Sequence, residues 1–246
     1  MMDKTLLKGL EGLERLVEAG RPLGVTAFAE LCGLTKSNAH RILRTFAAAG
    51  FLRQNAETRE YVPSLKLWEL GSRTVVDLDL RTQAADVMRW LANETRETVH
   101  LSVLDGNEVV YLDKIDSPEP VRAYSRIGGR APAYCVATGK AQLAYADPAT
   151  LEVMLGQMER HTPNTIVDPE TLRTELASIR TVGFAINRGE WRESVWGIAD
   201  VIRVRMAIVG AIGISGPSFR LDDAERLERL AGLVHEAAQR VSRQLG

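Results

Sequence analysis

The residues between Lys36 and Arg44 have the composition and spacing of a surface that binds nucleic acid. At helical spacing, Lys36, His40 and Arg44 fall in one row, and Ser37 and Arg41 fall in the row beside it. No acidic residue lies in or beside this stretch. A free helical face of basic and hydrogen-bonding side chains suits the major groove of DNA, where base edges offer donors and acceptors. The sequence therefore predicts a helix that reads DNA.

The neighbouring residues predict the elements that would position this helix. Residues 25–50 are expected to form two short helices joined by a tight turn at 32–34, where Gly33 supplies the permissive backbone. Ala29 is small enough to let the two helices approach closely. The second helix has one apolar face, made of Ala39, Ile42, Leu43 and Phe46. This arrangement is a helix-turn-helix.

A β-hairpin is expected directly after the second helix. Residues 51–54 form one extended segment, residues 55–58 a polar turn, and residues 59–62 a returning strand that Pro63 stops. A helix-turn-helix followed by a hairpin is a winged helix. The alternative is a helical hairpin packed in an ordinary core, with a charged face that is only solvated.

Eight residues of this module are predicted to meet DNA. Thr35 is expected to cap the recognition helix and to turn its amide end toward phosphate. The candidates for base edges are Ser37, Asn38, His40 and Arg41. The expected phosphate contacts are Lys36, Arg44 and, on the wing, Arg59.

Charge is distributed unevenly along the chain. The 246 residues carry 31 Lys or Arg and 32 Asp or Glu, for a formal net charge of −1. Residues 1–65 hold nine Lys or Arg and seven Asp or Glu, so the basic excess is confined to the amino-terminal part. This distribution is expected when only one domain meets phosphate. At about 150 residues per domain, the length predicts two domains.

The remaining sequence predicts an α+β domain of the sensor type. Helices are expected at residues 64–71, 74–94, 135–146, 168–181 and 221–245. Strands are expected at residues 98–104, 109–112, 121–124, 195–203 and 207–215, with a hydrophobic period of two from Thr98 onward. Antiparallel strands flanked by helices are typical of this fold class.

The sequence contains no recognisable catalytic or metal-binding constellation, so neither an enzyme nor a cofactor is expected. The four histidines, His40, His100, His161 and His235, lack metal-ligand spacing. Cys135 could be a redox-sensitive thiol near a helix start, but a small packed side chain is the expected role. Its separation in sequence from Cys32 favours a reducing compartment. No apolar run approaches the ~20 residues that span a bilayer, and the amino terminus lacks a signal-peptide core, so a cytoplasmic protein is expected.

Four blocks in this order span nearly the whole chain: LEGLERLVEAGRPLGVTAFAELCGLTKSNAHRILRTFAAAGFLRQ, ETVHLSVLDGNEVVYLDKIDSPEPVR, GGRAPAYCVATGKAQLAY and GISGPSFRL. Together they resemble the IclR family of bacterial transcriptional regulators. The resemblance implies a winged helix-turn-helix at residues 1–64, a linker helix at 65–80 and a GAF-like effector-binding domain at 81–246. It also implies homodimers, often paired into dimers of dimers.

The resemblance further implies a pocket for a small carboxylate effector, such as a keto, sugar or aromatic acid. The positions that match this pocket are Ala123, Ala131, Tyr134, Ala137, Thr138, Asn187, Trp196, Gly213 and Ser215. Two departures from the family are Trp196, where Cys is common, and Gly213, where Ser is common. The tryptophan is expected to reshape the pocket or to stack on an aromatic ligand, and the missing hydroxyl removes one carboxylate contact.

We therefore expect a sequence-specific regulator, a repressor of a catabolic operon, that binds double-stranded operator DNA and is controlled by a small acid. Paired recognition helices would read half-sites about 34 Å apart. One alternative is a constitutive DNA-binding scaffold whose pocket is plugged by Trp196 and Tyr134. The other is an enzyme acting on a small acid with a DNA-binding appendage.

Overall fold

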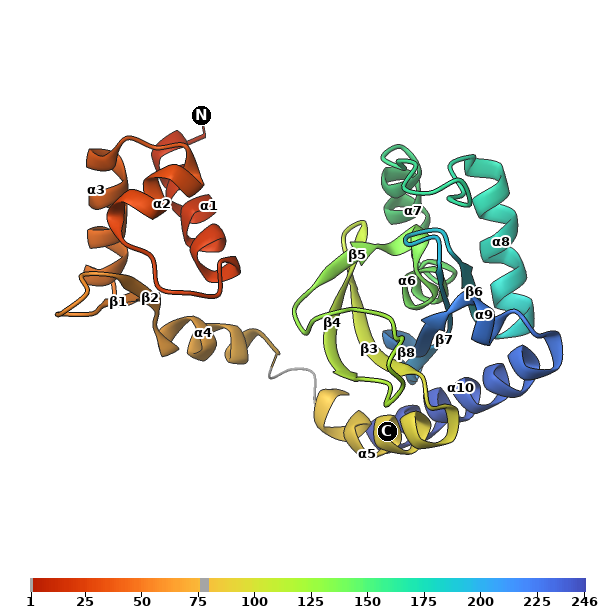
Figure 1. Cartoon of the computed structure of the whole chain (residues 1–246). Helices are drawn as coiled ribbons and strands as arrows, with labels where there is room; N and C mark the ends of the chain where they lie inside the picture. Colours follow the sequence, from red (N-terminus) through yellow and green to blue (C-terminus); the bar gives the residue numbers. More distant parts are fainter. Residues whose placement is uncertain (1, 76–79) are drawn as a thin grey trace. The chain divides into compact units, whose positions relative to one another are not determined.

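The chain forms two compact units, Met1–Asp77 and Leu78–Gly246, which are described separately (Figure 1). The structure is a computed structural model that describes residues 2–75 and 80–246. The end of the predicted linker helix and the start of the helix expected at 74–94 fall on residues 76–79, outside the described residues.

The amino-terminal unit is a winged helix-turn-helix, as predicted. Its elements are α1 (Lys4–Glu18), α2 (Val25–Cys32), α3 (Lys36–Ala48), β1 (Leu52–Gln54), β2 (Tyr61–Pro63) and α4 (Leu65–Val75). Gly33 ends α2 with a φ of 64°, a left-handed conformation that glycine adopts without steric cost. The buried side chains of Leu16, Phe28, Leu43 and Tyr61 close one core between the helices and the wing.

Two predicted boundaries in this unit are wrong. The second wing strand was expected at 59–62, but β2 begins at Tyr61 and includes Pro63, which lies opposite Leu52. Arg59 lies in the turn with a φ of 61°. Proline is tolerated there because it stands at the end of a two-stranded edge. The helix expected to end at residue 71 continues to Val75.

The carboxy-terminal unit is built on a six-stranded antiparallel sheet. The strands are β3 (Thr98–Asp105), β4 (Glu108–Ile115), β5 (Arg130–Pro132), β6 (Ala185–Arg188), β7 (Val195–Val204) and β8 (Ala207–Pro217), in the order β5-β4-β3-β8-β7-β6. The pairing of β3 with β8 joins the two hairpins into one sheet.

Helices cover both faces of this sheet. The helices α5 (Leu80–Thr95) and α10 (Ala224–Leu245) pack side by side on one face (Figure 1). The other face carries α6 (Ala137–Leu143), α7 (Pro148–Leu155) and α8 (Pro169–Val182). Alternate residues of β7 enter the two cores: Ile198 and Ile202 pack toward α5 and α10, and Ala199 and Val201 toward α6 and α8. Burial on both faces explains why the strand reads as a nearly continuous apolar run.

The strand predicted at 121–124 is wrong. These residues are described and contain no strand, and β5 takes the place beside β4 instead. The side chains of Val121 and Tyr124 are exposed, so the segment has no buried apolar face to hold it in a sheet. The strand β6 and the helix α7 were not predicted.

Two predicted helices begin later than expected. The helix placed at 135–146 is divided into a 3₁₀ turn, η1 (Ala133–Cys135), and α6, because Val136 is extended. The helix placed at 221–245 is preceded by a short α9 (Ser218–Leu221), and α10 starts where the Asp223 carboxylate accepts a hydrogen bond from the Arg226 amide at 2.7 Å. In contrast, Asp168 caps α8 as expected.

Two helical glycines give a matched test of this packing. A Cβ on Gly139 of α6 would collide with the Ala133 carbonyl, whereas a Cβ on Gly232 of α10 would meet nothing within 4 Å. We expect Gly139→Ala to lower the free energy of unfolding by about 1–3 kcal/mol or more through overpacking. Gly232→Ala should raise it by about 0.5–1 kcal/mol through helix propensity. Urea unfolding measures both changes, and equal effects would contradict the packing described.

Candidate functional site

The predicted recognition residues share the solvent-facing side of α3. Thr35 caps the helix, since its Oγ1 accepts a hydrogen bond from the Asn38 amide at 3.3 Å. Buried Ala39 and Leu43 fix the opposite side of α3 against the core. The exposed positions are Lys36, Ser37, Asn38, His40, Arg41 and Arg44. The helix therefore presents its polar and basic face outward.

The wing brings Arg59 close to this face. Arg59, His40 and Arg44 line one hollow of about 790 Å³, together with Glu60 and the start of α2. The Gln54 amide donates to the Arg59 carbonyl at 2.9 Å and fixes the turn. The helix α2 begins here without a side-chain cap, which leaves amide groups at its start for an anion. The hollow has the groups that a DNA phosphate needs.

A second candidate site is a cavity of about 580 Å³ in the carboxy-terminal unit. Its walls come from β3, β4 and β8, from the start of α6, and from the segments 122–126 and 187–197. Six of the nine predicted pocket residues line it: Ala123, Ala131, Ala137, Thr138, Asn187 and Ser215. The structure thus brings together six predicted residues that lie far apart in the sequence.

The other three predicted residues do not line the cavity. Gly213 lies where β8 packs so closely on β7 that a Cβ would collide with Ala199, so a serine does not fit there without a shift. Tyr134 faces away, and its hydroxyl donates to the Glu159 carbonyl at 2.8 Å. Burial raises the pKa of this Tyr134 hydroxyl.

Trp196 points to the opposite face of β7 from its neighbours. Val195 and Gly197 line the cavity, whereas Trp196 packs against the core beneath α5 and α10. The guanidinium of Arg188 lies 5.8 Å from its ring centre. Trp196 therefore neither plugs the cavity nor offers a stacking face inside it. The aromatic ring in the lining is instead Trp191, 4.7 Å from the Arg192 guanidinium.

The cavity is lined by cations without acids. Among the described lining residues none is Asp or Glu, and four are arginines, Arg122, Arg126, Arg130 and Arg192. Arg130 is paired outside the cavity, with Asp105 at 2.5 Å and Glu108 at 3.3 Å. These hydrogen bonds raise the pKa of Arg130. The net field of the lining favours an anion.

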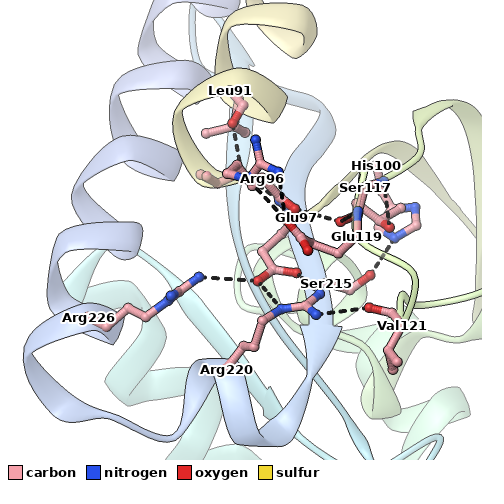
Figure 2. A network of polar contacts seen from close by, with 12 residues as sticks. Leu91, Arg96, Glu97, His100, Ser117, Glu119, Val121, Ser215, Arg220 and Arg226 are labelled. Atoms are coloured by element: carbon pink, nitrogen blue, oxygen red, sulfur yellow. Dashed lines mark hydrogen bonds and ion pairs between the residues drawn. The ribbon is translucent and has the colours of Figure 1, made fainter.

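The polar end of the cavity is a chain of three side chains centred on His100. Its Nε2 lies 2.6 Å from the Ser215 hydroxyl (Figure 2). Its Nδ1 lies 3.3 Å from the Ser125 hydroxyl. Burial, reinforced by the positive charge of Lys114, lowers the pKa of His100 from 6.5 to about 4.

At neutral pH the His100 ring is therefore uncharged, with one donor nitrogen and one acceptor nitrogen. In either tautomer, one serine gives its hydrogen to the ring and the other receives one. Of the two serine hydroxyls, one can consequently donate a hydrogen bond to a ligand in the cavity, and the other can accept one. Sequence reasoning missed this role for His100; the available signal was a histidine on an otherwise apolar strand.

A buried ion pair positions Asn187. The Lys140 ammonium is fully buried and lies 2.9 Å from Glu190 and 3.1 Å from Glu175. The Glu190 amide in turn donates to the Asn187 side-chain oxygen at 2.9 Å. Burial raises the pKa of Glu190, and the charge of Lys140 opposes that rise. Cys135 is also buried, which raises the pKa of its thiol to about 12 and disfavours a reactive thiolate.

Two further properties concern the described residues as a whole. No group of His, Cys, Asp and Glu in residues 2–75 and 80–246 could hold a metal ion. Of the helices within that same range, none combines the length and the apolar content needed to traverse a bilayer.

Comparison with known proteins assigns both units. Residues 71–243 match the family model of the bacterial transcriptional regulator IclR C-terminal domain, and residues 5–56 match that of the IclR helix-turn-helix domain. The HTH-type transcriptional regulator KdgR of Escherichia coli K12 is 36% identical over 238 residues, which cover 96% of this chain and 90% of that protein.

Two solved structures extend this likeness to the fold. The Thermotoga maritima IclR structure is 32% identical, with a TM-score of 0.80 and 98% coverage of both chains. An IclR homologue from Microbacterium hydrocarbonoxydans, solved with 4-hydroxybenzoate, is 28% identical, with a TM-score of 0.85 and coverage of 98% of this chain and 99% of that one. The relatives are named as transcriptional regulators and not as enzymes.

The depressed pKa of His100 predicts a defined pH dependence of stability. In the unfolded chain His100 becomes protonated below its ordinary pKa of 6.5, whereas in the folded chain it becomes protonated only near its lowered pKa of about 4. Stability is therefore lost as pH falls through this window, by about 3 kcal/mol at about 1.4 kcal/mol per pH unit. Urea unfolding should show a loss between pH 7 and pH 4 that is about 3 kcal/mol larger in the wild type than in His100→Gln. An equal loss in both proteins would mean that His100 titrates normally.

Proposed function

The chain belongs to the IclR family of bacterial transcriptional regulators, and from this membership we propose that it represses a catabolic operon under the control of a small acid. Its relatives are DNA-binding regulators with a helix-turn-helix domain. The observation that carries the proposal for this chain is the acid-free cavity lined by arginines, built in the unit that does not contain the recognition helix. Because the bacterial chromosome lies in the cytoplasm, we expect the protein to act there.

On DNA, α3 lies in the major groove and the wing contacts the backbone. Exposed Arg41 and Ser37 are suited to base edges because they lie four residues apart in one row on the free face of α3. Arg44 and Arg59 share a hollow with the start of α2, which suits phosphate. In this arrangement base contacts specify the operator and the hollow sets the register.

Two copies of the chain would present two recognition helices. Large apolar side chains are exposed on α1, at Leu6, Leu10 and Val17, and on α4, at Leu65 and Trp68. Exposed apolar groups of this number favour association with a second copy. A homodimer, or a dimer of such dimers, would then read two half-sites of a pseudo-palindromic operator about 34 Å apart.

The effector is a small carboxylate that carries a hydroxyl. The arginine-lined rim supplies charge for the carboxylate, and the Ser125–His100–Ser215 chain supplies a donor and an acceptor for the hydroxyl. The Microbacterium hydrocarbonoxydans homologue was solved with 4-hydroxybenzoate, a molecule of this type. An acid that binds one arrangement of the regulator better than another shifts its DNA-binding population.

Substitution of Arg41 and of Arg59 tests which arginine contacts DNA bases and which contacts phosphate. We expect Arg41→Ala to weaken binding to the native operator about 5- to 150-fold, because a lost base contact costs about 1–3 kcal/mol, and to change binding to random DNA little. Arg59→Ala should weaken binding to both DNAs alike and reduce the salt dependence. Fluorescence anisotropy at several salt concentrations measures these quantities. A loss for Arg41→Ala that is equal on both DNAs would assign Arg41 to phosphate.

Matched ligands test the charge of the effector. We expect 4-hydroxybenzoate or a hydroxylated sugar acid to raise the unfolding temperature, because a ligand that binds only the folded state stabilises it. The corresponding amide, such as 4-hydroxybenzamide, should give little shift because it lacks the charge that the arginines attract. Thermal-shift assays compare each pair. Absence of any shift across keto, sugar and aromatic acids would favour a constitutive DNA-binding scaffold, and turnover of an acid would favour an enzyme.

A further inference from the structure

One wall of the cavity is a segment without regular structure. Residues 117–126 run from the end of β4 toward β5 and contribute five consecutive lining residues, 122–126. The segment also carries two of the cavity arginines, Arg122 and Arg126. The shape and charge of the cavity therefore depend on what holds this wall in place.

The two ends of the wall are tied to the start of β3. At one end the Ser117 hydroxyl donates to the Arg96 carbonyl at 2.6 Å, and the Arg96 guanidinium contacts Glu119 at 2.7 Å. At the other end the Ser125 hydroxyl contacts His100, and the Ser125 carbonyl accepts a hydrogen bond from Lys114 of β4 at 2.7 Å. Residues 120–124 lie between these two ends. Among them, as the structure describes them, the Val121 carbonyl is the one backbone group that forms a hydrogen bond to a residue outside the segment.

The donor to this carbonyl is Arg220 of α9. Its Nη1 lies 2.9 Å from the Val121 oxygen, and its Nε and Nη2 form a bidentate pair with the Glu97 carboxylate at 2.8 and 2.6 Å (Figure 2). The guanidinium thus uses all three nitrogens, two on a carboxylate and one on the cavity wall. A planar fork of this kind fixes direction as well as distance.

Glu97 is itself immobilised. Its side chain is 1% exposed, and it lies so close to the β8 backbone that a Cβ on Gly216 would collide with the carboxylate. Glu97 is therefore a buried and closely packed partner for Arg220, and Arg220 in turn donates to the Val121 carbonyl.

We propose that Arg220 is a positioning residue of the effector cavity, oriented by Glu97 so that it holds the cavity wall in place at Val121. The hold on the wall stands on the geometry alone. The consequence for ligand affinity rests on the proposed function of the cavity as the effector site.

The structure contains a matched control. Arg226 of α10 contacts the same Glu97 carboxylate at 3.3 Å, and Figure 2 shows it approaching from the side away from Val121. A lysine at either position keeps a positive charge near Glu97. A lysine at position 220 loses the two-point pairing with Glu97 that directs the third nitrogen of the guanidinium at the Val121 carbonyl, because its ammonium sits on one flexible stem.

The experiment is trypsin cleavage of the full chain and of Arg220→Lys and Arg226→Lys, with fragments identified by mass spectrometry. The wall carries its own exposed cleavage sites after Arg122 and Arg126, and exposed Arg205 in the β7–β8 turn is a reference site. Cleavage of a folded protein reports how often the local segment opens. We expect Arg220→Lys to accelerate cleavage after Arg122 about tenfold, cleavage after Arg126 less strongly, and cleavage after Arg205 less than twofold. Arg226→Lys should change all three sites less than twofold.

Three results would overturn the proposal. They are unchanged cleavage of the wall in Arg220→Lys, equal acceleration in Arg226→Lys, and equal acceleration at Arg205, which would mean general destabilisation. A calorimetric titration with 4-hydroxybenzoate adds the functional arm, with affinity expected to fall at least tenfold in Arg220→Lys and less than twofold in Arg226→Lys. If the wild type does not bind this acid, that choice of effector fails, while the cleavage result still decides the role of Arg220.

Discussion

Antiparallel pairing of β3 with β8 fixes the geometry on which the cavity depends. It places His100 beside Ser215, 115 residues further along the chain, and Glu97 against Gly216. The contact of Glu97 needs a stretch of β8 backbone without a side chain, which Gly216 provides. The polar end of the cavity and the tie to its wall therefore come from the same pair of strands.

The charges of this unit fall into two groups with different roles. Buried Glu97 and Glu190 are each matched by an internal cation, Arg220 and Lys140, and loss of one partner would leave an uncompensated buried charge. Among the described residues, the lining of the cavity holds four arginines and no Asp or Glu, and one of the four, Arg130, is paired outside it with Asp105 and Glu108. Internal pairing thus keeps the carboxylates of the fold away from the cavity, which leaves its positive field for a ligand.

The sequence predicted those parts of the fold whose residues repeat with a clear period. The recognition helix, the wing and the four long strands follow from helical or alternating spacing and from local caps such as Asp168. The missed strand β5 has only three residues and is defined by its long-range pairing with β4, which local spacing does not show. Neighbouring residues of a strand point to opposite faces of the sheet, so Val195 and Gly197 line the cavity and Trp196 between them does not. The resemblance to a family therefore does not by itself show whether a residue of a pocket segment faces the cavity or the opposite face of the sheet.

The central claim is that acid binding in the cavity and operator binding by α3 are linked. The most direct measurement is the affinity of the full chain for DNA upstream of its own gene, at fixed salt, with and without a saturating acid that raises its unfolding temperature. Linkage predicts a change in DNA affinity of at least about fivefold, and the same factor for acid affinity when DNA is present. Identical DNA affinity with and without bound acid would contradict the account.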